Sequence, residues 1–158
     1  MKKRKLLIVA HTPSNNTRAL ADAIAAGAGD AAIEAVDVTI SSPFDCDAED
    51  VLASDGIILF TTENFGYMSG ALKDFFERIY YPCLDQPQRN EGKAFALVIR
   101  AGMDGTGTDI AVHKITSGLK WREVQDTTLC KGEYRESFAL QCRELGLTIA
   151  AGLDNGIF

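Results

Sequence analysis

The sequence predicts an α/β protein, a three-layer doubly wound sandwich with a five-stranded parallel sheet. Three unbroken apolar runs, at 6–10, 57–60 and 94–99, are typical of parallel strands that are covered on both faces. Polar turns and apolar residues at helical spacing follow these runs, and such alternation implies right-handed crossovers. Because 158 residues with 46% hydrophobic content can bury one core, we expect a single domain over residues 1–158.

The first apolar run should continue into a loop, a helix and a second strand. The run 6–10 precedes a turn-rich segment at 11–17. Apolar residues at helical spacing over 20–28, in an alanine-rich stretch that glycines close, predict a helix. Isoleucine and valine alternate with other residues over 32–40, which predicts a strand.

The middle of the chain contains the clearest amphipathic helix. A short helix is expected over 48–53, and the Asp55-Gly56 turn precedes the buried strand 57–60. Apolar residues at i, i+3, i+4 and i+7 over 72–79 then predict a helix with one buried face. Pro82 should end this helix, because proline lacks an N–H to donate.

The last third of the chain should supply two strands and two helices. The buried strand 94–99 leads into a glycine-rich loop at 101–108 and a helix that ends near Leu119. The segment 123–130 is polar but contains threonine and valine, which suits an edge strand. Apolar residues over 138–149 predict the final helix.

Charge and hydropathy exclude several classes of protein. The chain has 22 acidic and 16 basic residues, and a net charge of −6 has the wrong sign for binding a nucleic-acid backbone. No apolar run approaches the roughly 20 residues of a membrane span. The basic cluster Lys2–Lys5 resembles the start of a signal peptide, but the apolar stretch stops before His11. We therefore expect a cytoplasmic chain that binds neither nucleic acid nor membrane.

Cysteine and histidine usage gives no sign of a metal site. Cys46, Cys83, Cys130 and Cys142 form no C-x-x-C pair, and the chain has only 2 histidines. We expect reduced thiols and no metal ligands. The sequence also singles out no catalytic acid, base or nucleophile.

Three polar loops should meet at one edge of the predicted sheet. They are 12–17, 61–68 and 101–108, and each follows a buried strand. In open parallel sheets, ligands bind beyond the carboxyl ends of the strands, where the winding reverses direction. We therefore expect the functional site there.

The first loop has the composition of an anion site at the start of a helix. Thr12, Ser14 and Thr17 supply hydroxyls, and Asn15 and Asn16 supply amides. Free N–H groups and the helix dipole favour an anion there without a lysine, and the Walker pattern of triphosphate sites is absent. These residues suit a single phosphate monoester. The competing interpretation is that they only cap the helix and form its turn.

The second and third loops suit a flat heterocycle. Phe65 and Tyr67 offer apolar and stacking surface, and Gly66 lets the backbone approach a ligand closely. The loop 102–107 adds bare backbone N–H groups. This loop is not a dinucleotide-binding fingerprint. The third glycine of that motif is missing at Ile110, and the loop does not follow the first strand, as the motif requires.

Two stretches resemble a known family. Residues 6–21 resemble the phosphate loop of flavodoxin-like proteins. Residues 55–75, with Phe65-Gly66-Tyr67-Met68-Ser69-Gly70 near the centre, resemble the second flavin loop of the NAD(P)H-dependent FMN reductases and of the quinone reductases related to the tryptophan-repressor-binding protein. The resemblance covers nearly the whole chain and implies a flavodoxin-like sheet with strand order 2-1-3-4-5.

The resemblance implies a noncovalently bound FMN. Its phosphate would lie in the first loop, and its isoalloxazine ring would lie between 64–68 and 101–107. The residues expected to contact FMN are Thr12, Ser14, Asn15, Asn16, Thr17, Thr62, Asn64, Phe65, Gly66, Tyr67, Met68, Ala101, Gly102, Gly105 and Gly107. His11, Pro13 and Asn15 depart from the phosphate loop of electron-carrier flavodoxins.

The resemblance also implies an activity. We expect an FMN oxidoreductase that passes electrons from NAD(P)H to a quinone or similar small acceptor, in a homo-oligomer. The third loop carries no aromatic residue, so one ring face stays open for a substrate. The alternative is a flavodoxin-type carrier, which the acidic charge fits because such a carrier docks on basic partners. A domain that has lost its cofactor is the third hypothesis.

Overall fold

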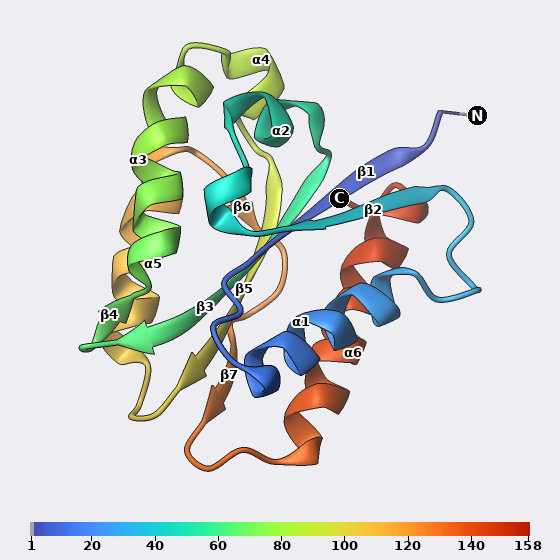
Figure 1. Ribbon diagram of the computed structural model, residues 1–158. Coiled ribbons are helices and arrows are strands. Elements are labelled where there is room, and N and C mark those ends of the chain that lie inside the picture. The colour runs from blue at the N-terminus through green and yellow to red at the C-terminus, as the bar shows by residue number, and fades with distance from the viewer. Residues whose placement is uncertain (1) are drawn as a thin grey trace.

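A parallel sheet runs through the centre of the computed structural model, which describes residues 2–158 (Figure 1). The strands lie in the order β2-β1-β3-β5-β6, and β7 also pairs with β5. This confirms the predicted order 2-1-3-4-5, with β6 and β7 sharing the last position. The bounds are β1 (Arg4–Ala10), β2 (Val36–Ser41), β3 (Gly56–Asn64), β5 (Ala94–Ala101), β6 (Arg122–Glu123) and β7 (Thr128–Lys131).

Helices cover both faces of this sheet, which confirms the three-layer prediction. Figure 1 shows α1 and α6 on one side, and α3 and α5 on the other with α2 and α4 above them. The bounds are α1 (Asn15–Ala28), α2 (Ala48–Ala53), α3 (Gly70–Leu84), α4 (Pro87–Asn90), α5 (Thr106–Gly118) and α6 (Glu136–Asp154), with a 3₁₀ turn η1 (Pro43–Asp45). No helix within residues 2–158 has the length and apolarity needed to cross a membrane.

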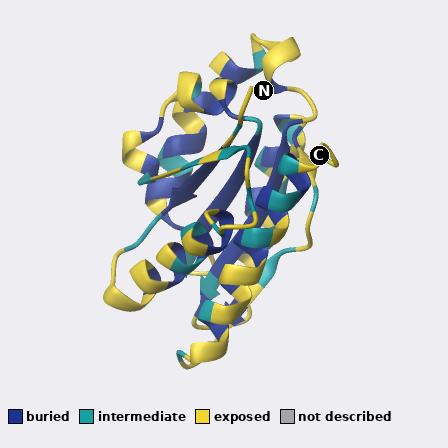
Figure 2. Ribbon diagram, turned by 90° about the vertical axis from the view of Figure 1, so that its right-hand side faces the viewer, coloured by how far each residue is buried: buried dark blue, intermediate teal, exposed yellow. Residues whose placement is uncertain are grey.

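The core divides at the sheet because successive strand residues point to opposite faces. On β1, Leu6 and Ile8 pack toward α1 and α6, whereas Leu7 and Val9 belong to the cluster under α3 and α5. Figure 2 shows the strands buried and the outer faces of the helices exposed. An unbroken apolar run is therefore required on each central strand.

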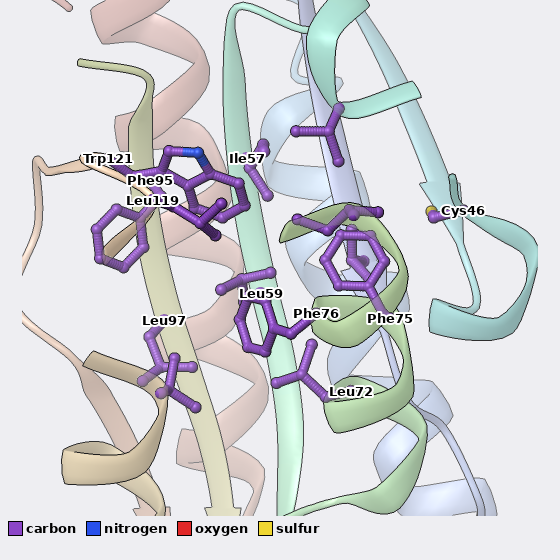
Figure 3. Close-up of a cluster of buried hydrophobic side chains, with 14 of the residues drawn as sticks. Cys46, Ile57, Leu59, Leu72, Phe75, Phe76, Phe95, Leu97, Leu119 and Trp121 are labelled. Atoms are coloured by element: carbon purple, nitrogen blue, oxygen red, sulfur yellow. The ribbon is translucent and has the colours of Figure 1, made fainter. Parts of the chain in front are cut away.

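Aromatic side chains fill the layer between the sheet and α3 (Figure 3). Phe75, Phe76 and Phe95 are buried, and burial of one such side chain contributes about 1.5 to 3 kcal/mol. The Phe76 and Trp121 ring centroids lie 6.4 Å apart. The Trp121 indole N–H donates to Asn90 Oδ1 at 2.8 Å, so its polar end is also satisfied.

The second strand is shorter than predicted, because it begins at Val36 instead of residue 32. The Asp30 carboxylate and carbonyl accept the N–H groups of Ala32 and Ile33, at 2.9 Å each, and form a turn. The next two amides, of Glu34 and Ala35, donate to the Asp154 carboxylate at the end of α6. These donors are unavailable to a neighbouring strand.

The prediction that Pro82 ends the third helix was wrong. Helix α3 continues to Leu84 with Pro82 inside it. Pro82 removes one helical hydrogen bond, because its nitrogen carries no hydrogen, and only two helical residues follow it. Cys83 is fully buried in the core, and the Asp85 N–H donates to the Tyr81 carbonyl at 3.0 Å, so the last turn is held by packing and by its own bonds.

The edge strand predicted over 123–130 is interrupted. β6 pairs Glu123 with Phe95, and β7 pairs Thr128 with Val98, so the four edge residues between these pairs lie opposite two residues of β5. The surplus residues leave the ladder, and there Thr127 Oγ1 donates to Asp109 Oδ1 at 2.8 Å. An edge strand tolerates this break because its outer side has no partner strand to lose.

His113 connects α5 to the edge strand. Its Nδ1 lies 2.8 Å from the Asp109 carbonyl oxygen, and its Nε2 contacts the Glu123 carboxylate. Burial by itself lowers the pKa of His113, but the hydrogen bonds to Glu123 and to the Asp109 carbonyl raise it above 6.5 overall. The doubly protonated ring is the form that donates to both acceptors.

The His113 contact predicts a pH dependence of stability. Because its folded pKa is raised, its stabilisation is fully present below pH 6.5, the unfolded value, and is lost as the pH rises through the folded pKa. Urea unfolding of the protein and of His113→Gln should show a difference in unfolding free energy that shrinks as the pH rises. Glu123→Gln is the matched control and should flatten the same profile. A difference that does not change with pH would contradict this assignment.

Candidate functional site

The loops that follow β1, β3 and β5 lie along one edge of the sheet, at the lower end in Figure 1. The winding reverses between β1 and β3, which are neighbours in the sheet although β2 separates them in the chain. The His11 N–H donates to the Phe60 carbonyl at 3.1 Å and ties the first loop to the middle of β3. The predicted convergence of the three loops at the carboxyl edge is confirmed.

Two of the predicted phosphate-binding residues hold the start of α1 together. Ser14 is the N-cap, and its Oγ accepts the Thr17 N–H at 3.2 Å. Thr17 Oγ1 accepts the Ser14 N–H at 3.0 Å, which completes a capping box. In the structure, the capping interpretation therefore describes what these two hydroxyls do.

The remaining donors of the first loop face outward. The amides of Asn15 and Asn16 open the helix, and neither has a hydrogen-bond acceptor among residues 2–158. Arg18 Nη2 donates to Thr12 Oγ1 at 3.1 Å. An anion at this helix start would meet free amides, the dipole of a 14-residue helix and a guanidinium.

Arg18 is the residue that sequence reasoning missed. The first loop was expected to bind phosphate without a cation, yet Arg18 lies one helical turn from Ser14 and touches Thr12. The signal was present, because a helix that starts at Asn15 brings position 18 back over its first turn.

The second loop contains a hairpin that the sequence analysis did not predict. β4 (Tyr67–Met68) turns back antiparallel along β3, pairing Glu63 with Met68 and Asn64 with Tyr67. Phe65 and Gly66 form the two-residue turn with φ of 53° and 70°, the signs that a type I′ turn requires. Positive φ is strained for a bulky residue such as Phe65, whose side chain is fully exposed.

This hairpin docks on the start of α5. A Cβ on Gly107 would lie 2.0 Å from the Gly66 carbonyl oxygen, so only glycine allows the observed approach. Thr108 Oγ1 donates to the Tyr67 carbonyl at 2.9 Å. Gly107, predicted to face the flavin, therefore also holds two of the site loops together.

Glu63 joins the second loop to the third. Its Oε1 accepts the Met103 N–H at 2.8 Å, and its Oε2 accepts the Gly105 N–H at 2.7 Å. We call this pair of bonds the Glu63 clasp. The third loop was expected to present bare amides to a ligand, and for these two amides that expectation was wrong.

Other predicted contacts fall in different environments. Thr62 Oγ1 is buried and has no hydrogen-bond partner among the described residues. Asn64 and Gly102 are exposed at the edge, whereas Ala101 and the Met68 side chain belong to the core under α3 and α5.

The titratable groups of the edge do not form a catalytic set. His11 is half-buried, and burial lowers its pKa, so the ring is neutral at pH 7. Within residues 2–158, no three histidine, cysteine or acidic side chains are grouped as metal ligands.

A doubly wound parallel sheet with the order β2-β1-β3-β5-β6 defines a flavodoxin-like fold. The model of the family described as NADPH-dependent FMN reductase matches residues 4–134. The chain belongs to that family.

Named relatives at the sequence level include flavodoxin. A flavodoxin from Aquifex aeolicus is 28% identical over 115 residues, which cover 73% of this chain. The aligned residues span 60% of that relative's length.

Solved structures share the fold. An archaeal flavodoxin superposes with a TM-score of 0.75 at 20% identity, covering 94% of this chain and 98% of its own. Two-electron reduced flavodoxin from Megasphaera elsdenii gives 0.72 at 22% identity, covering 92% of this chain and 98% of its own. A WrbA-like flavodoxin protein from Agrobacterium tumefaciens gives 0.73 at 17% identity, with 98% of this chain and 99% of its own covered. These likenesses establish the fold alone.

Family membership implies FMN, and the edge residues fit that group. A phosphate monoester matches the free amides of Asn15 and Asn16 beside Arg18. The family thus accounts for donors that are otherwise unsatisfied.

The hairpin contact predicts that Gly107→Ala destabilises the protein. An added methyl group would collide with backbone, and such overpacking costs about 1 to 3 kcal/mol, more than the helix propensity that alanine gains. Urea unfolding measures the loss. The matched control is Gly102→Ala, where the added Cβ meets nothing within 4 Å. Equal stabilities of the two variants would show that the hairpin does not rest on α5.

Proposed function

We propose that this protein binds FMN and carries electrons between redox proteins, as a flavodoxin does. This departs from the sequence-based expectation of an NAD(P)H-dependent reductase. Support comes from the flavodoxin of Aquifex aeolicus and from the flavodoxins among the structural neighbours. The geometry of the exposed edge adds an argument of its own.

Different loops of the protein contact the phosphate and the ring of FMN in this proposal. The Asn15 and Asn16 amides and the Arg18 guanidinium hold the phosphate, with Thr12 beside them. The Glu63 clasp and the close approach of Gly66 to Gly107 hold the hairpin and the third loop in contact, so the expected ring position between them is closed. The ring is placed instead on the exposed surface that these two loops share. FMN supplies the reversible uptake of one or two electrons, and the protein supplies orientation and electrostatics.

Exposed apolar side chains beside the proposed flavin site favour a protein as the electron acceptor over a small molecule. Phe65 is fully exposed at the tip of the hairpin, and Met103 is 78% exposed in the third loop. Both flank the Glu63 clasp, so large apolar side chains border the proposed ring position. Exposed apolar surface of this kind marks contact with another protein. The net charge of −6 favours a basic partner, because opposite charges steer encounter.

A reductase is the second candidate, and the family model favours it. In this function NAD(P)H reduces the bound FMN, and a quinone or similar small molecule takes the electrons away. A homo-oligomer in which a neighbouring subunit covers Phe65 fits this hypothesis. A covered hairpin tip would leave less apolar surface for a protein partner.

A redox assay on the full-length chain separates the two functions. FMN added to the protein should give a stoichiometric yellow complex, and a reductive titration should resolve two separate one-electron steps. The chemically reduced protein should then reduce cytochrome c, a basic protein, at a rate that falls with salt. Rapid NADPH oxidation that depends on added quinone would instead establish the reductase. A protein that stays colourless with FMN would refute both functions.

Arg18→Gln should weaken FMN far more than riboflavin. Loss of a charge-assisted hydrogen bond costs about 1.5 to 3 kcal/mol, or roughly 10- to 100-fold in affinity, and riboflavin has no phosphate to lose. Fluorescence titration with both flavins measures the ratio. Arg122→Gln removes the same charge at the opposite end of the sheet and should bind both flavins like the original protein. Equal weakening of both flavins by Arg18→Gln would remove Arg18 from the phosphate site.

A further inference from the structure

A cavity lies at the opposite end of the sheet from the loops proposed to bind FMN. Its volume is about 490 Å³. The start of β1, the end of α2 and the turn after α4 form its walls, at the end where Figure 1 places the N-terminus. β1 has 7 residues, and at about 3.3 Å a residue this puts roughly 20 Å between the cavity and the first loop. The cavity is therefore separate from the proposed flavin site.

The lining of this cavity is cationic although the chain is acidic. Five cationic side chains line it, against two carboxylates. The cations are Lys2, Lys3, Lys5, Arg89 and Lys93, and the carboxylates are Asp55 and Glu91. We call this set the amino-edge pocket.

Both carboxylates of the amino-edge pocket are already engaged. Asp55 accepts the Lys5 N–H at 2.8 Å and lies 3.6 Å from Arg4 Nε. Glu91 is 3.1 Å from the Lys120 ammonium. They leave little negative charge free to neutralise the lysines.

Two of the five cations are paired at the rim, and three are not. Lys3 lies 3.2 Å from Asp37, and Arg89 is 2.6 Å from Glu49. No carboxylate of the described chain lies within 4.0 Å of the ammonium groups that remain. These belong to Lys2, Lys5 and Lys93.

Lys93 is the buried member of this group. Its side chain lines the pocket, the residue is only 7% exposed, and its ammonium donates to the Ser54 carbonyl at the end of α2. That bond uses one of three N–H donors and brings no negative charge. Burial lowers the pKa of Lys93, and the charge of Asp55, whose carboxylate is not within 4.0 Å of the ammonium, offsets the cost of burial only in part. A bound anion would remove this cost.

We propose that the amino-edge pocket binds the phosphate group of a small phosphorylated molecule, with Lys93 as the buried anchor and Lys5 and Lys2 at the opening. A phosphate offers three acceptor oxygens to the unused donors of these ammonium groups. The volume is large enough for a ligand that extends beyond the phosphate itself. The site does not depend on FMN and stands apart from the proposed electron transfer.

Binding of inorganic pyrophosphate and phosphate tests the proposal. Each is titrated into the full-length protein at constant ionic strength, and the amide chemical shifts are followed by NMR. We expect saturable shifts at millimolar concentration in residues 52–55 and 88–93, both with and without FMN. Arg18→Gln should leave these shifts unchanged, which separates this pocket from the phosphate end of the flavin site.

Lys93→Met should weaken pyrophosphate binding by about tenfold or more, because it removes a charge-assisted contact. Lys114→Met, which removes an exposed lysine from α5, should bind normally and is the matched control. Lys5→Met should weaken binding without disturbing the core, and it provides the test if Lys93→Met does not fold. The proposal is overturned if the original protein shows no saturable shifts in 52–55 and 88–93, or if both pocket variants bind like the control.

Discussion

Burial of both faces of the parallel sheet is the constraint on which the rest of this structure depends. Leu6 and Ile8 need α1 and α6 above them, while Leu7 and Val9 need α3 and α5 below. To return to the next parallel strand, the chain must cross each face as a helix. The carboxyl ends of β1, β3 and β5 therefore meet the amino ends of helices at one edge, and the free backbone amides of the α1 start lie there.

The edge owes its shape to contacts between loops as well as to the sheet. Glu63 takes two amides of the third loop, and Gly107 admits the carbonyl of Gly66. These contacts hold the hairpin against the third loop and α5 without a bound ligand. A binding site that is already ordered loses less conformational entropy when a ligand binds than a mobile loop does. The strained turn at Phe65 is held at the tip of that arrangement.

Cationic side chains lie at both edges of the sheet, although the net charge of the chain is negative. At the carboxyl edge, Arg18 adds to the positive end of the α1 dipole. At the amino edge, helices end rather than begin, so their dipoles do not favour an anion, and lysine side chains supply the positive charge instead. Both edges are therefore locally positive, the carboxyl edge through a helix dipole and an arginine and the amino edge through lysine side chains.

The apolar pattern of the sequence determined the layers and the edge at which the loops meet, whereas the strand order came from the resemblance to flavodoxin-like proteins. The layers and this edge follow from the period and burial of apolar residues, which are local properties of runs such as 6–10 and 57–60. The apolar pattern predicted the start of β2 wrongly, because a group distant in the sequence takes the backbone donors there. The Asp154 carboxylate accepts the amide N–H groups of the two residues before β2.

Tertiary structure alone decided the geometry within the site. The Glu63 clasp joins residues 40 or more positions apart, and the approach of Gly107 to Gly66 depends on how the hairpin settles on α5. Lys93 and Ser54 are 39 positions apart and meet only because β5 and α2 share one end of the sheet. Residue types therefore predicted where a ligand would bind, but the free donors could be identified only once the folded chain had satisfied the others.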